Sequence, residues 1–368
     1  MSKLFQSSIL SIISILSIFS IPLTAAQEPL FSDEYYLGTV KEVTEQSSEI
    51  IGQDQIIQNL SIEITEGPDK GTQLELDHDY SSFDKASRKV EQGEQIIVLK
   101  NREFDTTLYY IADKYRIPWM IGLLLAFFAL TIFFTGIKGF TSLIGLAFNI
   151  GIIVHFIIPR IIAGDSPLLI CLIGGFVIAI VSLYCAHGFN KRTTIALVST
   201  LITLIIATIL AQLVVNWASL SGTGTEEAFF LQFGELANVN LKGLLLGGII
   251  IGVLGVLDDV TTAQAAAVDE LKKANSNLDP QELYKRGLSI GKEHITSLVN
   301  TLALAYAGAS LPVLIIFTIS NQPLWVVFNS EFVAEEVIRT LVGSTALILA
   351  VPITTYIAAH SFGKPKHS

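Results

Sequence analysis

Long apolar runs recur from residue 117 almost to the end of the chain. Each approaches or exceeds the roughly 18 residues needed to cross a bilayer as a helix, and almost none carries a charge. We expect spans at about 117–136, 140–159, 167–186, 194–216, 241–257, 298–319 and 337–358. The pattern predicts an all-α polytopic membrane protein with about seven transmembrane helices over residues 117–358.

Residues 27–116 follow a different pattern, with short alternating or β-branched runs separated by turn residues such as Gly67 and Pro68. The predicted strands are Tyr36–Val43, Ile56–Ile64, Thr72–Leu76, Gln95–Lys100 and Thr106–Ile111. Short strands without a helical period are typical of a small barrel or sandwich. We therefore expect a small N-terminal extracytoplasmic β domain, with an OB-like or SH3-like barrel as the fold.

Residues 1–26 have the features of an export signal. Lys3 supplies a positive start, Ile9–Leu23 is apolar, and Thr24-Ala25-Ala26 resembles a cleavage site. An uncleaved signal anchor is the alternative. Both interpretations place residues 27–116 outside the cytoplasm.

The lysines and arginines set the expected orientation, because cytoplasmic loops of membrane proteins are enriched in them. With the β domain outside, the inner loops hold Lys138, Lys191, Arg192, Lys272, Lys273, Lys285, Arg286, Lys292, Lys364 and Lys366. The reverse orientation would put nearly all of these charges outside. We expect a multi-pass protein of the plasma membrane whose C-terminal tail, residues 359–368, is cytoplasmic.

Composition excludes one class of partner. Charged residues make up 15% of the chain and the formal net charge is -10, so the basic footprint of a nucleic-acid-binding protein is missing. The lipid bilayer is the expected partner. Cys171 and Cys185 are separated by about 21 Å along one predicted helix, too far to form a disulfide with each other.

The segment Gly252–Leu271 carries the most distinctive chemistry, because Asp258 and Asp259 stand where an apolar run becomes a polar helix. Carboxylates are costly in hydrocarbon and mark functional positions. If the helix is continuous, Asp258 and Thr262 share one stripe with small side chains. Such a face suits a cation, a water-filled cleft or a closely packed helix.

A helical hairpin over residues 258–297 follows from the local signals. Asn275-Ser276-Asn277 breaks the first helix, and Asp279-Pro280-Gln281-Glu282 starts the second with an aspartate cap. In the fifth span, Gly248, Gly252 and Gly255 are predicted to mediate helix packing. A broken helix, as in many transporters, is the alternative there.

Two long motifs carry a family resemblance, Gly252–Leu271 and Gly291–Pro312. With the β domain ahead of the spans, they resemble the YibE/F family of bacterial multi-pass membrane proteins. The resemblance implies the same topology and a bacterial cell membrane. It supplies no substrate and no catalytic residues.

Three hypotheses about function remain open. In the first, the protein is a permease-type transporter of an ion or small solute. The candidate ligands are Asp258, Asp259, Thr262, Gln264, His294 and Asn300. Carboxylate, hydroxyl and amide oxygens suit a hard divalent cation, with Asp258 and Asp259 as metal candidates, and paired carboxylates also suit a proton relay.

In the second hypothesis the polar groups are structural, with an aspartate capping the next helical segment. The protein would then be a non-transporting assembly or signalling protein that couples the outer β domain to the cytoplasmic hairpin. The third is an intramembrane metal-dependent hydrolase, for which the sequence offers no metalloprotease or serine-hydrolase motif. We expect no catalytic residues and no cofactor beyond a divalent cation. The glycines permit a homodimer, and a second family member is another expected partner.

Overall fold

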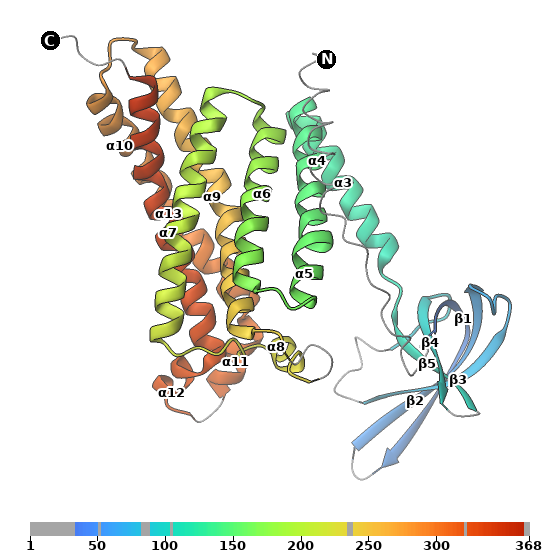
Figure 1. The fold of residues 1–368 in the computed structure, drawn as a ribbon. Helices are drawn as coiled ribbons and strands as arrows, with labels where there is room; N and C mark the ends of the chain where they lie inside the picture. The colour runs from blue at the N-terminus through green and yellow to red at the C-terminus, as the bar shows by residue number, and fades with distance from the viewer. Residues whose placement is uncertain are drawn as a thin grey trace. The chain divides into compact units, whose positions relative to one another are not determined.

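The computed structural model describes residues 34–50, 53–81, 89–103, 106–233, 238–319 and 322–363. The predicted export signal, residues 1–26, lies outside this part. The chain divides into two compact units, with the boundary near residue 130, inside the first helix after the sheet. Each unit is described by itself (Figure 1).

The first unit contains a five-stranded antiparallel sheet in the order β3-β2-β1-β4-β5. The strands are β1 (Glu34–Ile50), β2 (Gln53–Glu66), β3 (Gln73–Ser81), β4 (Gln95–Glu103) and β5 (Thr106–Lys114). All five overlap the predicted strands, because alternating apolar residues and turn glycines specify strands locally. The predicted β fold of this part of the chain is confirmed.

The sheet curls because β1 is long and irregular. β1 pairs with β2 along its length and with β4 only over Glu34–Thr39, and its ladder with β2 shifts register at two places. The edge strands β3 and β5 approach each other, so the sheet curls toward a partly open barrel, as expected of an OB-like domain. Its interior includes Val40, Leu60 and Ile96, which are 0–1% exposed.

Six helical segments of the described chain are long and apolar enough to cross a membrane. They are α3 (Ile117–Thr135), the combined rod Ile137–Ile162, α6 (Pro167–His187), α7 (Lys191–Trp217), α9 (Leu241–Ala274) and α13 (Glu331–Phe362). The rod consists of α4 (Ile137–Ile152), the π-helical turn η2 (Ile153–Ile157) and α5 (Ile158–Ile162). The short helices α8 (Glu226–Phe230) and α12 (Leu324–Asn329) lie between spans.

The remaining predicted span, 298–319, is not one helix. It falls across the end of α10 (Pro280–Ala309) and the whole of α11 (Leu311–Ile319), with the break at Ser310. Pro312 explains the break, because proline lacks an N–H and its ring clashes with the carbonyl four residues earlier. The polytopic helical class is confirmed, and the number seven is approximate.

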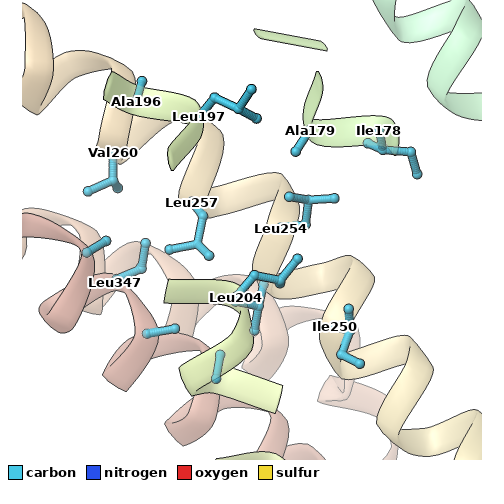
Figure 2. Packing of buried hydrophobic residues seen from close by; sticks show 14 of the residues in the cluster. Ile178, Ala179, Ala196, Leu197, Leu204, Ile250, Leu254, Leu257, Val260 and Leu347 are labelled. Carbon is cyan, nitrogen blue, oxygen red and sulfur yellow. The ribbon is translucent and has the colours of Figure 1, made fainter. Parts of the chain in front are cut away.

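Helix α9 occupies the middle of the second unit, with α6, α7, α10 and α13 packed around it (Figure 1). In Figure 2, Leu254 and Leu257 of α9 lie beside Leu204 of α7. Leu257 and Leu204 are completely buried. Because α9 is continuous for 34 residues, the broken-helix alternative for the fifth span is wrong, and neither aspartate caps a new segment.

The turn between α9 and α10 falls at residues 275–279, where the sequence predicts a break and a cap. The Asp279 carboxylate accepts the N–H of Glu282 at 2.8 Å, which satisfies one free donor of the first turn. Helix α10 therefore starts at Pro280, and the hairpin is formed by two long helices.

Candidate functional site

Asp258 lies on α9 where that helix faces α6. The hydroxyl of Ser182 donates a 2.5 Å hydrogen bond to Asp258 Oδ2. The other carboxylate oxygen, Oδ1, is buried and has no hydrogen-bond partner in the described part of the chain. One turn further along α9, the hydroxyl of Thr262 is also buried and unpartnered. Two buried oxygens, one helical turn apart along α9, are therefore available to a proton, a cation or a polar solute.

Asp259 has different surroundings from its neighbour. Its side chain is exposed, and it interacts electrostatically with His187, the last residue of α6. Adjacent residues on a helix point in directions about 100° apart, so the two carboxylates do not share one pocket wall. Asp258 is the half-buried member of the pair, and Asp259 is the accessible one.

Further polar groups of α9 bind other neighbouring helices. Thr261 is fully buried and shares a 2.8 Å hydrogen bond with Thr200 of α7. Gln264, only 2% exposed, donates to the Gly287 carbonyl of α10 at 2.8 Å and to Thr355 Oγ1 of α13 at 2.7 Å. Gln264 therefore fastens three helices together, which is a structural role.

The two candidates on α10 lie on different faces of that helix, with His294 on the side of the buried residues and Asn300 away from it. His294 is half-buried and Asn300 is exposed, and no hydrogen bond joins either of them to Asp258 among the described residues. The buried positions of α10 are Leu283, Gly287 and Gly291. Asn300 lies on the opposite face of the helix from these residues, since α-helical positions repeat every 3.6 residues. Gln264 is therefore engaged in the contact between α9, α10 and α13, Asn300 is on the exposed face of α10, and His294 is on the side of α10 that faces its neighbours.

Gly248, Gly252 and Gly255 form one face of α9 together with Asp259, which we call the glycine face. A Cβ atom added to Gly248 would lie 3.2 Å from an Arg339 guanidinium nitrogen, and one added to Gly252 would lie 3.3 Å from the Tyr306 hydroxyl. A Cβ added to Gly255 would meet no described atom within 4 Å beyond the backbone of its own helix. The glycine face is thus approached by polar side chains near Gly248 and Gly252 and is open at Gly255.

The close helix contacts use other glycines. A Cβ atom on Gly247 would lie 2.6 Å from Cys171 Sγ of α6. On α10, a Cβ on Gly287 would lie 2.8 Å from Val268, and one on Gly291 would lie 2.9 Å from Gln264 Oε1. These positions bring the backbones of neighbouring helices together, as small residues do in membrane bundles.

Arg339 and Ser182 are the residues that sequence analysis misses. The Arg339 side chain, on α13, is 21% exposed and lies 3.3 Å from Glu336 in an ion pair. A charge inside an apolar stretch is a recognisable signal, and it points to Arg339. Ser182 gives no comparable signal, because serine is common in transmembrane helices and its role depends on the neighbouring helix.

The described residues contain no group of three or more His, Cys, Asp or Glu side chains able to hold a metal ion. A cation at Asp258 would therefore need hydroxyl or carbonyl oxygens to complete its shell. Ser182, which already contacts the carboxylate, and Thr262, whose hydroxyl is buried without a partner in the described chain, are candidates to provide them. The site fits a lightly coordinated cation or a proton better than a permanent metal centre.

Comparison with known proteins gives one match. A family model described as YibE/F-like protein matches residues 123–364. No curated protein and no solved structure matches the chain. The match covers the membrane helices, the Asp258–Asp259 pair and the hairpin.

Proposed function

The chain belongs to the YibE/F-like protein family, and we propose that it is a permease-type transporter of an ion or small solute. The observation that carries the proposal is the state of Asp258. One of its oxygens is held by Ser182, and the other is buried without a partner. A half-buried carboxylate inside a helical membrane domain is costly, so its presence points to a role in binding what is moved.

The glycine face supports the same proposal. It runs from Gly248 to Asp259 along α9, with no bulky side chain of its own. Arg339 and Tyr306 approach it near one end, and Asp259 lies at the other. A face of small residues between polar groups suits the passage of a small hydrophilic species along the helix.

A coupling step follows from the Ser182–Asp258 hydrogen bond. An ionised Asp258 accepts the Ser182 hydroxyl and holds α6 against α9. When a proton or cation neutralises Asp258, that hydrogen bond weakens, because charge-assisted hydrogen bonds are roughly twice as strong as neutral ones. Neutralisation would therefore loosen the α6–α9 contact, which is the kind of change that alternating access requires.

The test is ion flux into proteoliposomes containing the purified full-length protein. Proton, Mg²⁺ and Ca²⁺ uptake would be followed with trapped fluorescent indicators under an imposed gradient. We expect uptake of one of these ions by the wild type and its loss in the Asp258→Asn/Asp259→Asn double variant. The matched control is Glu270→Gln, which removes an exposed carboxylate from the same helix. Equal uptake by the wild type and the double variant, or no uptake above empty liposomes, would contradict the proposal.

A further inference from the structure

A shallow cavity of about 330 Å³, largely open to solvent, lies where α7 begins and α13 ends, apart from the Asp258 site. It is lined by Asn190, Lys191, Arg192, Asp269, Lys273 and Phe362. These residues come from α7 with its cap, from α9 and from the end of α13. Its volume is at the lower end of the range of about 300–1,000 Å³ that is typical of small-ligand pockets.

The cavity wall is cationic. Three of its side chains are basic and one is a carboxylate, which leaves an excess of two positive charges. The carboxylate, Asp269, already pairs with Lys273 at 2.7 Å. The excess charge therefore belongs to Lys191 and Arg192, which are adjacent in the first turn of α7.

Arg192 has unused binding capacity. It is half-buried, and among the described residues it makes no hydrogen bond or ion pair. Lys191 is partly engaged, since its ammonium contacts the Ser361 carbonyl and lies 5.2 Å from the centre of the Phe362 ring. An unengaged guanidinium presents a planar fork of donors that matches the oxygens of a phosphate group.

The N-terminus of α7 alone does not explain why an anion would bind in this cavity. The Asn190 side chain already accepts the N–H of Thr193 at 2.9 Å, so the helix has its own cap. An anion in the cavity would depend on the basic side chains that surround it. The three helices that line it are also candidate membrane spans, and the cavity lies at their polar ends, where lipid phosphates are found.

We propose that this cavity binds a phosphate group. The group belongs either to the headgroup of an anionic phospholipid or to a free phosphate, and the chemistry of recognition is the same in both cases. Arg192 and Lys191 supply the charge, and Lys273 contributes once its pairings with Asp269 and Glu270 are relaxed. This site is independent of the transport proposal, because none of its residues takes part in the Asp258 site.

The experiment measures thermal unfolding of the full-length protein. One set of samples is in nanodiscs of phosphatidylcholine, alone or doped with phosphatidic acid. The other set is in detergent, with or without inorganic phosphate at constant ionic strength. We expect the wild type to be stabilised by a phosphate-bearing additive, since a ligand that binds only the folded state raises its stability. Stabilisation by phosphatidic acid but not by inorganic phosphate identifies the lipid headgroup as the ligand. Stabilisation by inorganic phosphate identifies a free phosphate.

Three variants locate the site. Arg192→Gln should weaken the response by roughly tenfold in ligand concentration, the loss expected for one charge-assisted hydrogen bond. Asp269→Asn should strengthen it, because the acidic side chain among the described wall residues becomes neutral. Lys285→Gln is the control, because Lys285 is an exposed lysine of α10 outside the cavity.

The gain expected of Asp269→Asn keeps the test decisive if Arg192→Gln does not fold. No stabilisation of the wild type in either set would overturn the proposal. Equal stabilisation of the wild type and Asp269→Asn by the additive would also overturn it. The same holds if Lys285→Gln loses as much of the stabilisation as Arg192→Gln does.

Discussion

Ser182 and Asp258, 76 positions apart, are joined by a 2.5 Å hydrogen bond that links α6 to α9. The bond places a carboxylate between two membrane helices with only one of its oxygens satisfied. Helix α9 also contacts α7, α10 and α13. A change of charge at Asp258 therefore acts on the central helix of the bundle.

Ser182→Ala tests how much this hydrogen bond contributes to the free energy of unfolding. The substitution leaves Oδ2 of Asp258 without its donor, and we expect a loss of about 1–2 kcal/mol in unfolding free energy, between the values for charged and average membrane hydrogen bonds. The measurement is denaturant or thermal unfolding in detergent. The control is Ser199→Ala, because the buried Ser199 hydroxyl donates to the Ile195 carbonyl of its own helix. Equal effects of the two substitutions would mean that the contact between helices adds nothing.

Two glycine-to-alanine substitutions, at Gly291 and at Gly255, are expected to have different effects on the free energy of unfolding. At Gly291, an added Cβ would contact Val351 too closely and lie 2.9 Å from Gln264 Oε1, so Gly291→Ala should destabilise the protein by about 1–3 kcal/mol. At Gly255, an added Cβ would meet no atom of another described part of the chain within 4 Å. Gly255→Ala should therefore be neutral or stabilising by up to about 1 kcal/mol, the difference in helix propensity. Thermal unfolding of both variants checks this, and a destabilised Gly255→Ala would show that the glycine face is closed.

The β domain contains a pH-dependent ion pair. Lys100 is 7% exposed, contacts Asp69 and lies between the rings of Tyr36 and Tyr109. The hydrogen bond with Asp69 raises the pKa of Lys100 above its ordinary value. A raised folded-state pKa gives stability that is fully present below the unfolded value of about 10.4 and is lost as the pH rises through the folded value.

We therefore expect Lys100→Gln to increase trypsin cleavage within residues 34–114 of the full-length protein by an equal factor at pH 7 and pH 9. Lys41→Gln is the control, because the ion pair of Lys41 with Glu63 is solvent-exposed. If the difference in cleavage between Lys100→Gln and the wild type became smaller from pH 7 to pH 9, the assigned direction of the Lys100 pKa shift would be wrong.

Local signals account for the parts of the fold that the sequence predicts. The cap at Asp279 and the strand pattern of the β domain depend on neighbouring residues, and both are found. Pro312 also carries a local signal, but the continuous apolar run around it favours a single span, and the structure divides that run at Ser310.

The candidate site is less predictable, because it depends on how helices rotate against one another. The carboxylates are recognisable by their cost in a membrane, whereas the choice of Ser182 as the partner of Asp258 is made by packing across 76 positions. For the same reason Gln264 faces Gly287 and Thr355 and lies outside the Asp258 site. Hairpin connectivity brings α9 and α10 together, but it does not decide which face of α10 carries His294 or Asn300.

The most direct test of the central claim is the transient current of the reconstituted full-length protein on a solid-supported membrane after a jump in pH or divalent cation concentration. We predict a transient charge displacement in the wild type and in Glu270→Gln, and its loss in Asp258→Asn. Each variant would be compared at equal protein density and with its folded state verified by size-exclusion chromatography. A displacement in Asp258→Asn equal to that of the wild type would contradict a role for Asp258 in transport.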